Sequence, residues 1–184
     1  MKQDNLRCYA EISLEAMRHN IREVKKRLPE GVKLLGVVKA NAYGHGAVPV
    51  ASYLENQVDY FATATIEEAV ELRENGISAP ILILATCPRP STATLWNTTS
   101  LRRSTATHRH LPSKKRQHAR TGKQKAHLAV DTGMTRIGFQ VTEHDADEAA
   151  KIADLPHIEL EGMFTHFSCA DQETRRTVRC RWKI

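Results

Sequence analysis

A single lysine, Lys39, ends an apolar run and stands directly before a glycine-rich turn, in the stretch "GVVKANAYGHG" (36–46). A lysine that only keeps a surface soluble needs no such turn behind it. A lysine that forms a covalent bond needs a deprotonated amine, and burial at a strand end near other cationic groups lowers the pKa of that amine. The alternative is a side chain that reaches from the strand end into solvent. The turn favours a nucleophilic amine at this position.

Three other residues have types and positions that suit ligand binding. Tyr43 carries a hydroxyl on the same turn, where Gly44 and Gly46 permit positive φ and a close backbone approach. Arg136 lies in the loop after an apolar segment, and its planar guanidinium suits anionic oxygens. His166 stands at the end of a further apolar segment. Each also has an ordinary explanation, as a half-buried turn tyrosine, a surface arginine or a hydrogen-bonded core histidine.

Hydrophobic patterning predicts the strands and helices that position these residues. After Ser13, a candidate helix N-cap, apolar residues recur every three or four positions up to Leu28, and Pro29 and Gly31 follow. The run 32–40 is almost continuously apolar, which is typical of a strand buried on both faces. The predicted strands are 7–12, 32–40, 59–64, 79–85, 127–131 and 158–167, and the predicted helices are 14–28, 47–56, 66–75 and 143–153.

The order of these elements predicts an α/β fold with a parallel sheet and helical crossovers. Two architectures fit this order, an open doubly wound sheet and a (β/α) barrel. The turn after 32–40 lacks the G-x-G-x-x-G sequence of dinucleotide-binding sheets, which favours the barrel. Functional groups of a barrel gather at the carboxyl ends of its strands. We therefore expect Lys39, Arg136 and His166 to converge on one face.

The segment 86–124 departs from this pattern. It has no apolar periodicity, and residues 75–130 hold ten Lys or Arg and no Asp or Glu. Outside that range the chain has 17 basic and 21 acidic residues, so the overall net charge of +6 belongs to one segment. This composition suggests translation in a shifted reading frame over 86–124, and again after about Gln172. We expect 86–124 and 173–184 to be divergent or disordered.

Three motifs in this chain resemble those of alanine racemases, which use pyridoxal 5′-phosphate (PLP) on a barrel domain. They are "VVKANAYGHG" (37–46), "VDTGMTRIGF" (130–139) and "GMFTHFSCAD" (162–171). The resemblance covers roughly 7–86 and 125–172. It implies that 1–184 forms part of the N-terminal barrel domain, with the fold class α/β, a partial (β/α)8 TIM-type barrel that lacks the later strands and the C-terminal β-domain.

The resemblance also assigns roles to the four candidate residues. Lys39 would hold PLP as a Schiff base and act as the catalytic base on the face that yields or consumes D-alanine. Tyr43 would reach the cofactor phosphate, and His166 would lie against the pyridine ring. Arg136 would contact the substrate carboxylate or the phenolic oxygen of the cofactor. Many relatives hold that arginine with a carbamylated lysine, at a position where this chain has Ala129.

The implied activity is the interconversion of L-alanine and D-alanine, which supplies peptidoglycan precursors. In this family the second base is a tyrosine from the C-terminal β-domain, supplied across a homodimer interface, and we find no such domain in these 184 residues. Half a barrel also leaves unpaired strand edges and an uncovered apolar face. We therefore expect the 184-residue chain alone to be unstable or aggregating, and weakly active or inactive.

Two other functions remain open. A small single-domain PLP-binding barrel of the cofactor-homeostasis type fits the length, although its lysine motif is less similar. The basic stretch 109–120 suggests a nucleic-acid-binding arm, but no aromatic residue lies near it to stack on bases. No apolar stretch approaches the roughly 18 residues of a membrane span, and the first residues contain no secretory apolar region.

The four cysteines are widely spread and form no C-x-x-C pair. This spacing argues against a zinc site and against a disulfide scaffold, and it fits a reducing compartment. The histidines at 108, 110 and 118 have no cysteine or carboxylate nearby to complete a metal site. The sequence thus predicts a cytoplasmic PLP enzyme that acts on alanine, with no metal and no nucleic-acid or membrane partner.

Overall fold

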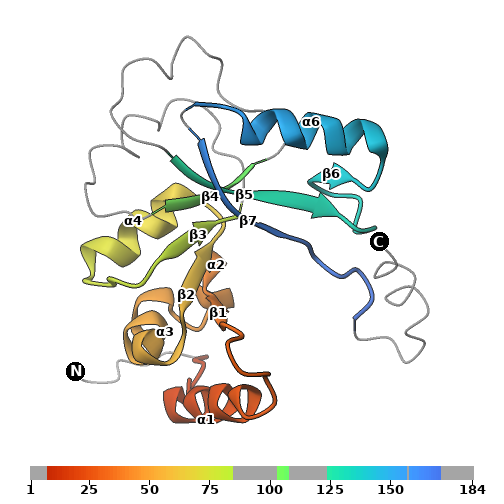
Figure 1. Cartoon of the computed structure of the whole chain (residues 1–184). Helices are drawn as coiled ribbons and strands as arrows, with labels where there is room; N and C mark the ends of the chain where they lie inside the picture. Colours follow the sequence, from red (N-terminus) through yellow and green to blue (C-terminus); the bar gives the residue numbers. More distant parts are fainter. Residues whose placement is uncertain (1–7, 85–102, 108–123, 157, 171–184) are drawn as a thin grey trace.

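A computed structural model of the chain describes residues 8–84, 103–107, 124–156 and 158–170 (Figure 1). The strands are β1 (Leu35–Val37), β2 (Tyr60–Thr63), β3 (Ile81–Ile83), β4 (Arg103–Thr107), β5 (Gln124–Asp131), β6 (Phe139–Gln140) and β7 (Ile158–Phe164). The helices are α1 (Leu14–Lys25), α2 (Lys39–Tyr43), α3 (Ala47–Leu54), the 3₁₀ helix η1 (Glu55–Gln57), α4 (Ile66–Glu74) and α6 (Glu143–Ala153). No helix within these ranges is both long and apolar enough to cross a bilayer.

The strands form one sheet in which every pairing is parallel. Neighbours follow the chain in the order β1-β2-β3-β4-β5-β7, while β6 pairs with the last two residues of β5. Parallel neighbours in sequence order need a crossover between each pair of strands. The prediction of an α/β fold with a parallel sheet is confirmed. Over the described residues β1 pairs only with β2, and β7 pairs only with β5, so the sheet is open.

Side-chain caps set where the helices begin. The Ser13 hydroxyl accepts the Ala16 N–H at 3.1 Å, as its N-cap position predicts. Thr65 and Glu68 form a reciprocal capping box at α4, and Thr142 caps α6. The predicted helices over 47–56, 66–75 and 143–153 are confirmed. The first helix ends at Lys25, a few residues before the predicted end.

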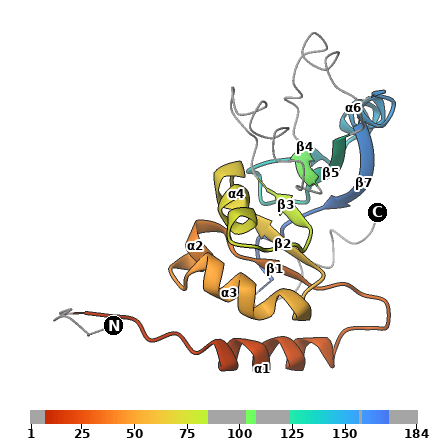
Figure 2. The ribbon, with the colours of Figure 1, turned by 90° about the vertical axis from the view of Figure 1, so that its left-hand side faces the viewer.

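The buried residues that the structure describes form two apolar clusters. One lies between β1–β3 and the helices α3 and α4, where Phe61, Leu72 and Ile81 are almost completely buried. The other joins β5, β6 and β7 to α6 through Leu128, Phe139, Ile152 and neighbouring residues. Figures 1 and 2 show α3 and α4 beside the first three strands, α1 beside α3, and α6 beside the last strands. Both clusters therefore pack helices against the sheet.

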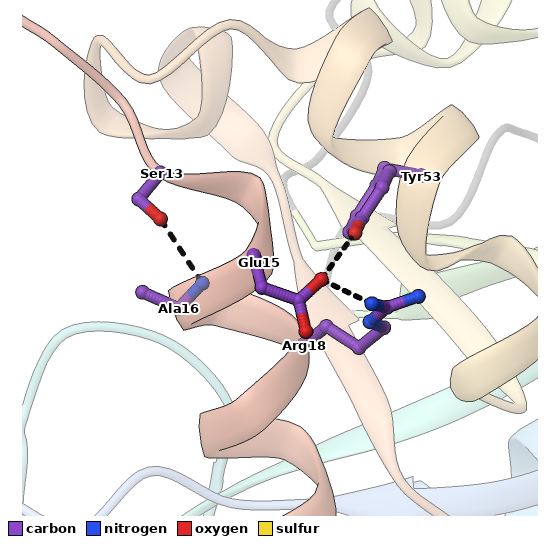
Figure 3. Close-up of polar contacts among 5 residues, drawn as sticks. All are labelled: Ser13, Glu15, Ala16, Arg18 and Tyr53. Carbon is purple, nitrogen blue, oxygen red and sulfur yellow. Dashed lines mark hydrogen bonds and ion pairs between the residues drawn. The ribbon is translucent and has the colours of Figure 1, made fainter.

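The helix α1 is attached to α3 by polar contacts on its surface. The Tyr53 hydroxyl donates a 2.8 Å hydrogen bond to Oε2 of Glu15, and Arg18 pairs with the same oxygen (Figure 3). The Arg18 guanidinium also lies 5.4 Å from the centre of the Tyr53 ring. The hydrogen bond from Tyr53 lowers the pKa of the Glu15 carboxyl, and the same bond raises the pKa of Tyr53.

Two strand predictions need correction. The predicted strand 7–12 is not formed over its described residues 8–12, because this segment runs away from the described sheet, and Tyr9 is 70% exposed (Figure 2). The run 32–40 forms a strand only over β1 and is not buried on both faces. Val32 and Val37 are 50% and 43% exposed. Since β1 is an edge strand of the described sheet, its apolar residues lack a second neighbour.

A strand also lies inside the segment that we predicted to be divergent or disordered. β4 pairs in parallel with β3 on one side and β5 on the other, in the registers Leu82↔Ser104 and Ala106↔His127. It continues the sheet between the two apolar clusters. The described residues do not include 86–102 and 108–123, and the basic stretch 109–120 falls within the second of these ranges. They also do not include 173–184.

Candidate active site

Lys39 lies immediately beyond the carboxyl end of β1, as predicted. The ladder between β1 and β2 extends one residue further, because the Val38 N–H donates to the Ala62 carbonyl at 2.9 Å. Val38 is only 4% exposed and anchors the backbone. The Lys39 side chain is partly buried. Within the described ranges its amine forms no hydrogen bond or ion pair, so it is available to a ligand.

The turn after Lys39 is left-handed. Ala40, Asn41 and Ala42 have φ/ψ values near +52°/+48°, +53°/+45° and +51°/+43°, and Tyr43 has a φ of +53°. A left-handed conformation costs residues with a Cβ roughly 1–2 kcal/mol each. Gly44 follows with a φ of +88°, as its residue type predicts. Four consecutive non-glycine residues in this region need support from their surroundings.

Local hydrogen bonds hold the turn. The Ala42 N–H donates to the Val38 carbonyl at 2.9 Å, and Ala42 is buried. Oδ1 of Asn41 accepts the Ala47 N–H at 2.8 Å, which fixes the start of α3. Nδ1 of His45 lies 2.8 Å from the Ala42 carbonyl oxygen. His45 therefore contacts the backbone of the turn.

Glu68, a residue that the sequence analysis did not select, ties this turn to the next one. Its Oε1 accepts the Ala40 N–H at 2.8 Å, and its Oε2 accepts the Ala64 N–H at 2.7 Å. The only signal in the sequence is the pattern Thr65-x-x-Glu68, which predicts a helix cap and no contact with Ala40.

Tyr43 shares the turn with Lys39 and presents its side chain to solvent. It is 63% exposed. Its hydroxyl has no hydrogen-bond partner in the part of the chain that the structure describes. The turn is thus held by contacts within itself and by Glu68, and among the described residues the Lys39 amine and the Tyr43 hydroxyl have no partner.

Arg136 lies in a loop between β5 and β6 that Asp131 organises. Oδ1 of Asp131 accepts the Gly133 N–H at 2.8 Å and the Thr135 N–H at 2.9 Å. Gly138 closes the loop with a φ of +110°, and a Cβ there would lie 2.7 Å from the Ala129 carbonyl oxygen. Arg136 itself is exposed in this loop.

His166 stands two residues beyond β7, rather than at the end of the strand, and is exposed. The hydroxyls of Thr132 and Thr165 lie 2.7 Å apart and share a hydrogen bond. This contact joins the loop of Arg136 to the segment of His166, so the structure brings these two segments together.

Lys39, Arg136 and His166 all follow the carboxyl ends of parallel strands, and they lie along the same edge of the sheet. Lys39 follows β1, at one end of the described sheet, and His166 follows β7, which pairs with β5. No hydrogen bond or ion pair between described residues joins Lys39 to Arg136 or His166.

A charged cluster lies on the β5 face that carries Ala129. Nζ of Lys125 is 2.5 Å from Oε1 of Glu161, and Nε2 of His127 is 3.4 Å from Oε2 of the same residue. The hydrogen bond that Lys125 donates to Glu161 raises the pKa of Lys125. Ala129 is 1% exposed, so a small side chain fills this position. Within the described ranges no three His, Cys, Asp or Glu residues gather in a way that would hold a metal ion.

The family model for the alanine racemase N-terminal domain matches residues 12–182. The chain belongs to this family. The match includes all three motifs, and it confirms the resemblance inferred from them. It also runs across 86–124. The shifted reading frame that the composition of this segment suggests stays a prediction.

Curated relatives carry the name alanine racemase. Alanine racemase 2 from Caldanaerobacter subterraneus subsp. tengcongensis is 43% identical over 183 residues, which cover 92% of this chain and 44% of that protein. Alanine racemase from Clostridium kluyveri is 38% identical, over 94% of this chain and 44% of that protein. The chain therefore spans a little under half the length of these relatives.

Solved alanine racemases have the same fold over the matched part. The enzyme from Clostridium difficile 630 in complex with cycloserine has a TM-score of 0.77 at 37% identity, covering 91% of this chain and 46% of that one. The enzyme from Bacillus anthracis with bound L-Ala-P has a TM-score of 0.78 at 30% identity, covering 92% and 44%. At these identities and scores the comparison supports both the fold and the family.

Proposed function

We propose that the chain is the lysine-bearing part of an alanine racemase, an isomerase that interconverts L-alanine and D-alanine with PLP. The observation that carries this proposal is the available amine of Lys39, at the carboxyl end of β1, on a turn whose conformation is fixed by its own contacts. Family membership supports the reaction, and the position of the amine supports its chemistry.

The residues present fit PLP. Lys39 offers its aldehyde an amine that has no partner among the described residues, and the exposed Tyr43 offers a hydroxyl to its phosphate from the same turn. Arg136 and His166 follow strand ends on the same edge of the sheet, where they would bind the phenolic oxygen or substrate carboxylate and support the pyridine ring. When bound, PLP supplies a conjugated ring that takes up electron density from the Cα–H bond.

The chain's own chemistry is proton transfer on one face of the substrate. The Lys39 amine removes or returns the Cα proton on the face that yields or consumes D-alanine, which requires a group within hydrogen-bond reach of that proton. Inversion also needs an acid or base on the opposite face. We propose that a tyrosine from a C-terminal β-domain supplies it across a homodimer interface.

We propose that the sheet is part of a (β/α)8 barrel. The sequential order of parallel strands supports this architecture, because each strand in such a barrel pairs with the next one along the chain. Later strands would then pair with the free edges of β1 and β7. The 184 residues alone would be poorly stable, and weakly active or inactive.

The enzyme would supply D-alanine for peptidoglycan precursors in the cytoplasm. Within the described residues Cys8 and Cys169 form no disulfide, which fits a reducing compartment.

The test is to incubate the 184-residue chain with PLP, reduce it with borohydride, and map the added mass by peptide mass spectrometry. We expect the adduct on Lys39, and its loss in Lys39→Ala but not in Lys33→Ala, a lysine shortly before the same strand. Labelling spread evenly over surface lysines would contradict the proposal.

A parallel assay of L-alanine racemisation tests the activity of the chain alone. We expect little or none, although PLP is bound. Turnover typical of a full enzyme would contradict the need for a second base from elsewhere.

A further inference from the structure

Glu68 occupies the junction between two turns that follow neighbouring strands. It lies in the first turn of α4, is partly buried, and accepts backbone N–H groups from both turns. Ala40, on the β1 side, donates to Oε1 at 2.8 Å, and Ala64, on the β2 side, donates to Oε2 at 2.7 Å. Thr65 completes the capping box through the same Oε2, at 3.4 Å.

We propose that Glu68 is a positioning residue that fixes the direction of the Lys39 amine. This inference rests on the proposed function, because it concerns the residue that would bind PLP. Glu68 does not touch the reacting atoms. It acts through the peptide between Lys39 and Ala40, whose N–H it binds.

The left-handed turn explains why this peptide needs an external acceptor. A short turn cannot provide its first N–H with an acceptor from within itself. Ala40 is the first of four residues with positive φ, so the conformation that costs energy begins at this N–H. The Glu68 carboxylate satisfies it with a charge-assisted bond, which is stronger than a bond between neutral groups.

The carboxylate can serve both turns because it is acceptor-only. Each oxygen faces a different donor, and an amide of the same shape would present one oxygen and one NH₂. In Glu68→Gln the oxygen would keep the Ala64 and Thr65 donors of the capping box, and the NH₂ would face the Ala40 N–H. That variant therefore removes the contact with the lysine turn and preserves the helix cap.

Two neighbouring substitutions separate positioning from stability. Thr65→Ala removes the hydroxyl that caps α4 but leaves Glu68 facing Ala40. Glu67→Gln changes the charge in the same helical turn at an exposed residue. The first lowers stability without altering the Lys39 turn, and the second controls for the helix dipole.

The experiment measures three quantities in the full 184-residue chain and each variant. They are the rate of borohydride-trapped PLP labelling at Lys39, the urea midpoint, and amide hydrogen exchange at Ala40. In Glu68→Gln we expect labelling to slow by about tenfold and Ala40 exchange to accelerate by a similar factor, the size expected for one lost bond to a charged group. Thr65→Ala should lower the midpoint with unchanged labelling, and Glu67→Gln should change neither rate.

Two results would overturn the inference. One is an Ala40 exchange rate in Glu68→Gln equal to that of the unmodified chain. The other is a labelling rate that falls equally in Glu68→Gln and Thr65→Ala, which would make the effect one of stability. The exchange measurement requires no cofactor. If the unmodified chain fails to label at Lys39, the proposed function is contradicted, while Ala40 exchange still decides the role of Glu68.

Discussion

Because the turn after Lys39 is left-handed, we expect an alanine-to-glycine substitution in it to have an unusual effect on the stability of the chain. Ala40 is exposed, and its φ of +52° places its Cβ in a conformation that L-residues avoid. Replacing it with glycine removes the Cβ and leaves the N–H that Glu68 accepts. We therefore expect Ala40→Gly to leave the chain equally stable or to stabilise it, although glycine in place of alanine usually destabilises a helix.

The magnitude follows from two opposing terms. Relief of the left-handed conformation contributes roughly 1–2 kcal/mol, while the greater freedom of glycine in the unfolded chain costs about 0.4–1 kcal/mol. The free energy of unfolding should thus rise by about 0–1.5 kcal/mol. The matched control is Ala150→Gly, at an exposed position inside α6, which should lose about 1 kcal/mol.

Urea unfolding followed by circular dichroism measures both variants. We expect the two urea midpoints to move apart by the equivalent of about 1–2.5 kcal/mol, with unchanged m-values. Equal destabilisation by Ala40→Gly and Ala150→Gly would refute the left-handed turn, and with it the geometry assigned to Lys39.

Two further predictions concern other parts of the chain. Gly138→Ala should destabilise the chain by roughly 2–3 kcal/mol, because its Cβ would overlap the Ala129 carbonyl at positive φ; unchanged urea unfolding would contradict this. Burial opposes a low pKa for Glu55, but hydrogen bonds from Ala79 and Ser78 outweigh it and hold that pKa below the ordinary value. Glu55 should therefore stabilise the fold at pH values above the ordinary carboxyl pKa, and this stabilisation should be lost as the pH falls through the lowered pKa. In Glu55→Gln the urea midpoint should vary less with pH in that acidic range than it does in the unmodified chain.

Local rules predicted much of the fold from the sequence. Apolar periodicity located α1, α3, α4 and α6, and Ser13 caps the first of these helices as its hydroxyl predicts. Alternating helices and strands predicted the parallel sheet. Since the carboxyl ends of parallel strands share one edge, the positions of Lys39 and Arg136 relative to the sheet followed from the same pattern.

Predictions that depend on distant partners were less accurate. The apolar run 32–40 has the sequence of a buried strand, but burial needs neighbours, and β1 pairs on one side only. Glu68 was missed because a capping box is a local pattern, whereas its bond to Ala40 spans 28 residues. The glycines indicated a turn with positive φ, but they did not predict that Asn41 and its neighbours share that conformation.

The candidate site consists of two halves that are held by different contacts. Glu68 and the first apolar cluster fix the turn of Lys39, and the hydroxyls of Thr132 and Thr165 join the segments of Arg136 and His166. Among the described residues the two clusters share no buried residue, and β4 lies between their strands, paired with β3 and β5. The registers of β4 against these two strands therefore contribute to the distance between the amine of Lys39 and the guanidinium of Arg136. A change of register there would move one half of the site along the strands relative to the other.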